Sequence, residues 1–116
     1  MVIDVNTENH TYQGKQILEY KNNSPDTLNR VFYHLFFNAF RPNSEQVLAS
    51  KYATFERRGV AEKIANLKSE DWGLVEINKL LQDGSPVSFN VEETILEVVL
   101  NDPLLPNSST TFEMDF

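Results

Sequence analysis

The sequence predicts a mainly β protein, either an antiparallel β-sandwich or a curved sheet of about seven strands, with a partly helical insertion near residues 44–70. Short runs of alternating apolar and polar residues recur along the chain, as in strands with one buried face. Clusters of Asn, Asp, Ser, Gly and Pro separate most of these runs, as expected of turns. One charged, helix-favouring stretch interrupts the pattern.

The first forty residues predict three strands. Val2–Asn6 forms a short strand, and the next strand alternates over residues 16–21, with Tyr12 as its earliest start. Residues 22–26 contain Asn, Ser, Pro and Asp and predict a turn. Residues 28–40 are apolar on both faces of an extended chain, so we expect a central strand covered on both sides.

The insertion at residues 44–70 is charged and favours helix. Three apolar residues recur there at helical spacing: Val60, Ile64 and Leu67. Asn43 or Ser44 is expected to cap a first short helix, and Thr54 a second.

From Trp72 onward the β pattern returns. Four strands are expected there: residues 74–81, 87–91, 95–100 and 111–116. Asp83-Gly84 predicts a hairpin turn, and Glu92-Glu93 predicts the next turn. Two prolines mark a loop over residues 101–109. Because the last run still alternates where the sequence stops, we expect residues 1–116 to be a single β-domain cut from a larger protein.

Composition limits the classes of partner. The formal net charge is -7 at pH 7, and an acidic surface repels phosphate, so neither nucleic acid nor an anionic membrane is expected. The chain has no cysteine, which excludes disulfides, thiol nucleophiles and cysteine zinc sites. No apolar run approaches the roughly 18 residues of a membrane helix, so no membrane span is expected.

The sequence contains no motif that carries catalysis. His34 lies within an expected strand and is interpreted as a packed or hydrogen-bonded structural histidine, and His10 as a solvated turn residue. Neither has a second histidine four residues away, so the zinc motif H-E-x-x-H is absent, as is the nucleophile motif G-x-S-x-G. Three Asn-x-Ser/Thr triplets match the glycosylation pattern, at Asn9, Asn22 and Asn107.

Residues 21–40, KNNSPDTLNRVFYHLFFNAF, carry a resemblance to a known family. They resemble part of the amino-terminal β-domain of zinc aminopeptidases of the aminopeptidase N family, especially the bacterial members. The later order is also similar: a charged insertion, the hairpin at Asp83-Gly84, a proline loop and a final strand. The resemblance covers nearly the whole chain and is most specific around residues 20–40.

The resemblance implies a parent enzyme that removes amino-terminal residues from peptides. Its zinc, held by H-E-x-x-H and a later glutamate, belongs to a catalytic domain downstream, so we assign no catalytic, cofactor-binding or metal-binding residue to this chain. The expected role is a scaffold that packs on the catalytic domain of the same polypeptide and helps to wall the cleft for peptide substrates. Such a piece is expected to expose apolar patches or an unpaired edge strand that drives dimers.

Two other interpretations stay open. The first is a free-standing β-sandwich binding module of adhesion or carbohydrate-binding type, which would expose an aromatic strip around Trp72 or Tyr52. The second is a substrate-binding relative whose zinc motif has degenerated. An exported or periplasmic location and a cytoplasmic one in a bacterium are both compatible with the sequence.

Overall fold

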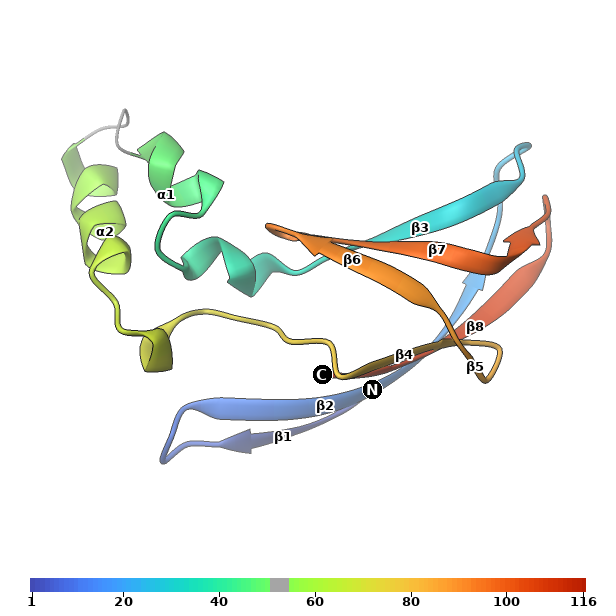
Figure 1. The fold of residues 1–116 in the computed structure, drawn as a ribbon, viewed down its shortest axis with the longest axis horizontal. Coiled ribbons are helices and arrows are strands. Elements are labelled where there is room, and N and C mark those ends of the chain that lie inside the picture. The colour runs from blue at the N-terminus through green and yellow to red at the C-terminus, as the bar shows by residue number, and fades with distance from the viewer. Residues whose placement is uncertain (51–54) are drawn as a thin grey trace. The chain divides into compact units, whose positions relative to one another are not determined.

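Eight strands, arranged in two antiparallel sheets, dominate the part of the chain that the structure describes, which confirms the mainly β fold class predicted with about seven strands. The structure is a computed structural model and describes residues 1–50 and 55–116 (Figure 1). The first sheet contains, in spatial order, β1 (Val2–Asn6), β2 (Thr11–Lys21), β8 (Ser109–Asp115), β4 (Lys79–Gln82) and β5 (Ser85–Pro86). The second contains β3 (Leu28–His34), β7 (Ile95–Leu104) and β6 (Ser88–Glu92).

The described chain divides into two compact units, which are treated separately below. Unit 1 contains most of the strand residues: Met1–Phe32, Glu76–Asn90 and Glu97–Phe116. Unit 2 contains the helical segments and the turn between β6 and β7: Tyr33–Val75 and Val91–Leu96.

The core of unit 1 forms because its strands alternate between an apolar and a polar face. β8 illustrates this pattern, since Thr110, Phe112 and Met114 are buried while their neighbours in the strand are partly or fully exposed. Phe112 lies opposite Leu18 of β2 on one side and Gln82 of β4 on the other. Other apolar side chains of the unit 1 core come from several elements: Val31, Leu80, Val87, Val98, Leu100 and Leu104.

Gly14 lets the C-terminal aromatic ring lie directly on β2. A Cβ atom at this position would come within 2.3 Å of the Phe116 ring. The backbones of Gly14 and Phe116 exchange two hydrogen bonds, of 2.7 and 3.0 Å, and the Phe116 ring meets Tyr12 edge-on at 6.1 Å. Any larger residue than glycine would force this ring away.

The hairpin between β4 and β5 turns at Asp83-Gly84, as predicted. Both residues have positive φ, 48° and 81°, as a type I′ turn requires. The Asp83 carboxylate accepts hydrogen bonds from the Thr110 hydroxyl (2.6 Å) and the Thr111 N–H (2.8 Å), which join the turn to β8. These two donors hold the pKa of Asp83 below its usual range.

Replacing Thr110 by valine is therefore expected to lower the free energy of unfolding by about 1 kcal/mol at neutral pH, because valine keeps the shape and removes the hydroxyl. Since the pKa of Asp83 is lowered in the folded state, this stabilisation is present above its unfolded pKa and is lost as the pH falls through the folded value. Urea unfolding at about pH 7 and at pH values stepped down to about pH 2 measures the difference. A cost of Thr110→Val that stays constant over this whole range would contradict this role of the hydroxyl.

The helical insertion is confirmed, and it lies in unit 2. It consists of α1 (Glu45–Ser50), α2 (Phe55–Ala65) and a 3-10 turn, η2 (Ser69–Asp71). Ser44 caps α1 as predicted, because its Oγ accepts a hydrogen bond from the Val47 N–H at 3.3 Å. The predicted cap Thr54 lies outside the described residues.

The expected apolar stripe of the second helix is wrong in part. Val60 is exposed, whereas Ala61 is buried, and Leu67 lies beyond the end of α2. The least exposed side of α2 instead contains the buried Ala61 and the half-buried Ile64, which line one groove together with Val47 of α1. The packing of α1 against α2 determines which residues of α2 are covered, because the charged helix has no pronounced apolar face of its own.

The expected strand over residues 28–40 is too long, and it is not covered on both faces. β3 ends at His34, and residues 36–40 form a 3-10 helix, η1 (Phe36–Phe40). β3 is also at the edge of its sheet, and Phe32 is 58% exposed. The Leu35 N–H donates to the Thr94 carbonyl, and the Asn38 N–H then donates back to Leu35, which starts the 3-10 turn.

The expected strand over residues 74–81 begins only at Lys79. Residues 74–78 form no strand, and Gly73 before them contacts η1, because its N–H donates to the Phe40 carbonyl at 3.1 Å. The second predicted turn is displaced by one residue, because Glu92 ends β6 and Glu93, with φ of 53°, opens the turn to β7.

Candidate functional site

The two histidines do not form a site with chemistry of their own. His34 ends β3 and is exposed, with its ring stacked on Phe36 at a centroid distance of 5.3 Å. It is thus packed on an aromatic ring while the residue stays exposed to solvent. His10 is exposed in the turn between β1 and β2. Within the described residues, no cluster of three or more His, Cys, Asp or Glu side chains could hold a metal ion.

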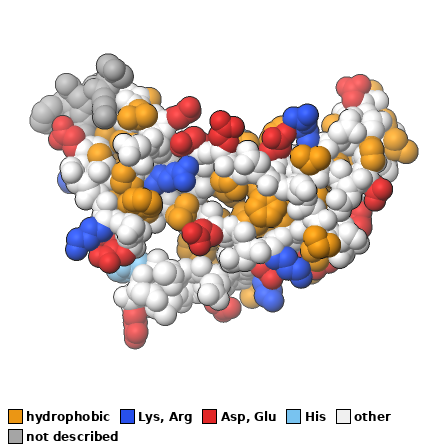
Figure 2. Space-filling view, viewed as in Figure 1, with side chains coloured by type: hydrophobic (Ala, Val, Ile, Leu, Met, Phe, Trp, Pro, Cys, Tyr) orange, Lys and Arg blue, Asp and Glu red, His pale blue; other side chains and the backbone are white. Residues whose placement is uncertain are grey.

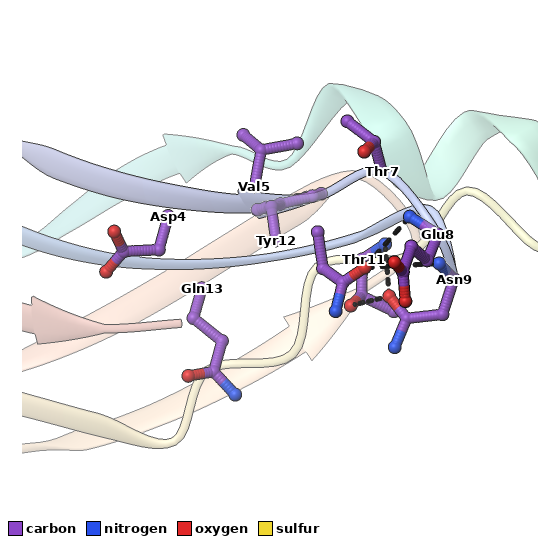
Figure 3. A pocket seen from close by; sticks show the side chains of 9 residues that line it. Asp4, Val5, Thr7, Glu8, Asn9, Thr11, Tyr12 and Gln13 are labelled. Atoms are coloured by element: carbon purple, nitrogen blue, oxygen red, sulfur yellow. Dashed lines mark hydrogen bonds between the residues drawn. The ribbon is translucent and has the colours of Figure 1, made fainter.

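A polar hollow of about 650 Å³ lies along the β1–β2 hairpin (Figure 3). Two of its amides are used by the turn itself: Asn6 Oδ1 accepts the Glu8 N–H at 2.9 Å, and Asn9 Oδ1 accepts the Thr11 hydroxyl at 2.6 Å. Figure 3 shows Asp4 and Glu8 at opposite ends of the hollow, so its acids do not converge. This geometry builds a turn and provides no binding centre.

Asn22 is a buried amide that holds two turns of unit 1 together. Its Nδ2 donates to the carbonyls of Asp26 (2.7 Å) and Leu104 (3.1 Å), and its Oδ1 accepts the Ser24 N–H (3.0 Å) and hydroxyl (2.7 Å). The side chain is 1% exposed. This glycosylation triplet is therefore a structural element, whereas those at Asn9 and Asn107 lie in exposed turns.

Asn38 has the same role in unit 2. Its Nδ2 donates to the Glu93 carbonyl at 3.1 Å, and its Oδ1 accepts the Val75 N–H at 2.8 Å. Arg41 lies 3.7 Å from the Glu93 carboxylate and adds an ion pair to the same corner. One buried amide thus ties η1, the β6–β7 turn and the extended segment after Trp72 into one body, which positions the phenylalanines of η1.

The pKa values of two tyrosine hydroxyls are unsuited to proton transfer at neutral pH. Burial raises the pKa of Tyr33 to about 12, and it also raises the pKa of Tyr12. A general base works best when its pKa is near the operating pH. Both phenols stay protonated at neutral pH and are poor candidates for acid–base work.

Several aromatic side chains of unit 2 are exposed near one another. We call the four side chains on η1 and just before Gly73 the aromatic surface: Phe36, Phe37, Phe40 and Trp72. Phe36 is 72% exposed. The two segments touch, because a Cβ atom on Gly73 would lie 2.8 Å from the Phe40 Cβ. Large apolar side chains exposed together are uncommon on a self-contained domain and mark contact surfaces.

An apolar groove of about 410 Å³ adjoins this surface in unit 2. Phe40 lines it together with side chains of both helices: Gln46, Val47, Ser50, Val60, Ala61 and Ile64. The exposed aromatic strip expected around Trp72 or Tyr52 is represented by Trp72, whose indole N–H donates to the Leu67 carbonyl at 3.2 Å. Tyr52 lies outside the described residues.

Unit 1 also exposes apolar side chains. Val2, Ile3 and Val5 are exposed on β1, one of the two edge strands of the five-stranded sheet. Phe32 and Val99 are exposed as well. Figure 2 shows hydrophobic side chains reaching the surface between acidic ones. No helix within residues 1–50 and 55–116 is long and apolar enough to cross a membrane.

Comparisons of the chain with protein-family models, with curated proteins and with solved structures found no match.

Proposed function

We propose that this chain is a non-catalytic scaffold domain that packs against the catalytic domain of a zinc-dependent aminopeptidase. The observation that carries the proposal is the aromatic surface on η1. Its phenylalanines are presented to solvent by a backbone that Asn38 holds from within. A domain that worked alone would gain stability by burying these rings, whereas a domain with a partner keeps them for the contact.

The energetics support a contact surface. Each Å² of apolar surface removed from water stabilises a contact by roughly 25 cal/mol. A fully buried phenylalanine therefore stabilises it by about 1.5–3 kcal/mol relative to an exposed one. Aromatic anchors of this kind dominate the binding energy of interfaces. The adjoining groove beside α1 and α2 offers room for a side chain of the partner next to Phe40.

The identity of the partner rests on the resemblance of residues 21–40 to the aminopeptidase N family. In that setting the zinc and the acid–base residues belong to the neighbouring domain, and this chain contributes to the wall of the cleft for peptide substrates. The reading frame that encodes this chain should then also encode H-E-x-x-H. A complete reading frame without that motif would contradict the proposal.

The expected effect of the aromatic surface is tested in the product of that complete reading frame. Changing Phe36, Phe37 and Phe40 together to serine should lower its melting temperature by several degrees, because the contact between the domains loses its anchors. Phe32→Ser is the matched control, since Phe32 is comparably exposed but lies in unit 1. An equal effect of the control and the triple variant would contradict this role of η1.

Zinc chemistry by the chain itself provides a second test. The isolated chain is expected to take up no stoichiometric zinc in calorimetry and to hydrolyse no aminoacyl reporter substrate. Zinc uptake that disappears on replacing His34 by alanine would overturn the assignment of this residue.

A carbohydrate-binding module is the alternative that the exposed Trp72 favours, because sugar rings stack on such indoles. Titration with glycans separates the two proposals. Saturable binding that is lost in Trp72→Ala would favour the binding module.

A further inference from the structure

One side of β2 is open over residues 16–21, within the part of the chain that the structure describes. β1 pairs with residues 11–15 of β2 only, whereas β8 pairs with residues 15–21 on the other side. Figure 1 shows β2 running on past the N-terminus with β8 beside it. An open strand edge presents unpaired N–H and C=O groups and is a template for another strand.

The hydrogen-bond pattern between β2 and β8 determines which backbone groups of β2 face the open side. Gly14 and Phe116 exchange both of their hydrogen bonds, and in an antiparallel pair such positions recur at every second residue. Gln16, Leu18 and Tyr20 therefore direct their N–H and C=O groups toward β8. The same groups of Ile17, Glu19 and Lys21 point to the open side.

When two copies of β2 are placed side by side along this edge, only one pairing register brings opposite charges together. If two copies of β2 pair antiparallel about Tyr20, Glu19 lies opposite the partner's Lys21, and Lys21 lies opposite the partner's Glu19. A register centred on Glu19 or on Lys21 places like charges directly opposite each other, which is destabilising. A register centred on Leu18 would place the partner's Lys21 opposite Lys15, and this register is excluded because Lys15 is already paired with β1.

We propose that the open edge of β2 binds a second copy of this chain, with the two strands antiparallel and centred on Tyr20. Glu19 and Lys21 both direct their backbone N–H and C=O groups to the open side. In this register, each Glu19–Lys21 pair therefore exchanges two backbone hydrogen bonds. Tyr20 meets the partner's Tyr20 at a non-hydrogen-bonded position, where side chains lie closer together. Ile17, 73% exposed, flanks the contact on the other face.

This dimer is independent of the scaffold role, because its residues belong to unit 1 and those of the aromatic surface belong to unit 2. Each copy carries a net charge of -7, which opposes association over a distance. The contact is therefore expected to be weak. It should be measured at about 0.15 M salt, where charges more than about 8 Å apart are screened.

Sedimentation equilibrium of the 116-residue chain, from about 10 µM to about 1 mM, tests the proposal, and the wild type is expected to dimerise within this range. Glu19→Lys and Lys21→Glu each place like charges in register and should raise the dissociation constant at least about tenfold. The double variant E19K/K21E exchanges the two charges, keeps the net charge, and should restore the affinity of the wild type.

Matched controls separate the register from net charge. Glu70→Lys and Lys68→Glu make the same charge changes on exposed residues of unit 2 and should leave the dimer unchanged. The proposal is overturned by a monomeric wild type at the highest concentration, by single variants that dimerise like the wild type, or by a double variant that does not recover.

Amide hydrogen exchange on the wild type tests the same edge without any substitution. Protection of the Glu19 and Lys21 amides should rise with protein concentration, while that of Leu18 and Tyr20, already paired with β8, should not change. Protection of Glu19 and Lys21 that is independent of concentration would also overturn the proposal. In the product of a longer reading frame, that result would indicate another segment of the chain on this edge.

Discussion

Replacing Phe112 by alanine is expected to lower the free energy of unfolding by about 3–5 kcal/mol. Phe112 is 1% exposed and stands in the middle of β8, between Leu18 and Gln82 of the neighbouring strands. Its removal loses the transfer free energy of the ring and leaves a cavity that the flanking strands close only in part. Urea unfolding followed by circular dichroism measures the change from the shift of the midpoint.

Phe32→Ala is the matched control for this prediction, because it deletes the same atoms from an exposed position of unit 1. Its cost should stay below about 1 kcal/mol. If Phe112→Ala unfolds the chain altogether, Phe112→Leu, with a smaller loss of volume, keeps the comparison measurable. Equal effects at the two positions would mean that Phe112 is not at the centre of the core.

Replacing Asn22 by alanine is expected to cost about 2–4 kcal/mol, although the residue is polar and lies in a turn. The substitution leaves the buried carbonyl of Leu104 without its donor and removes the acceptor of the Ser24 N–H. A buried polar group without a partner loses its hydration and gains nothing in return. The Asp26 carbonyl, in an exposed residue, is expected to recover a hydrogen bond from water.

Asn23→Ala provides the control, since Asn23 is exposed and adjacent in sequence. Its effect should lie within about 0.5 kcal/mol of zero. Chemical denaturation of both variants under the same conditions measures the difference. An Asn22→Ala variant as stable as Asn23→Ala would refute the structural role assigned to the buried amide.

The strands and turns that sequence predicted correctly are those with a strong local signal. The hairpin at Asp83-Gly84 requires positive φ at both positions, and Asp and Gly adopt it more readily than most residues. The alternation of β8 reports directly on one buried face, and that of residues 16–19 reports on one half-buried face. These features depend on neighbouring residues only, so the sequence is sufficient to predict them.

The end of β3 could not be predicted from the local pattern. Residues 28–40 are apolar throughout, and such a run fits an extended chain as well as a helical turn. The choice depends on the Thr94 carbonyl, which accepts the Leu35 N–H, and on the partners of Asn38 more than thirty residues away. The aromatic surface exists only because this segment turns into η1, so sequence reasoning missed it as a site.

The buried amides were missed for a related reason. Asn22 occurs in a run of turn-forming residues, where asparagine normally bonds its own backbone and contacts water. Its burial follows from the β7–β8 turn, whose Asn107 N–H donates to the Asn22 carbonyl at 2.8 Å. No local signal distinguishes Asn22 from the exposed Asn23 beside it.

By itself, the sequence determined a mainly β chain with antiparallel strands, a helical insertion and a type of hairpin turn, because alternation and turn chemistry act between near neighbours. Only the tertiary structure decided which aromatic rings are buried and which are exposed, which amides are buried, and which side of β2 stays open. Those properties depend on the segments that meet in space, and a backbone group or ring is satisfied or left exposed only once its distant partners are in place.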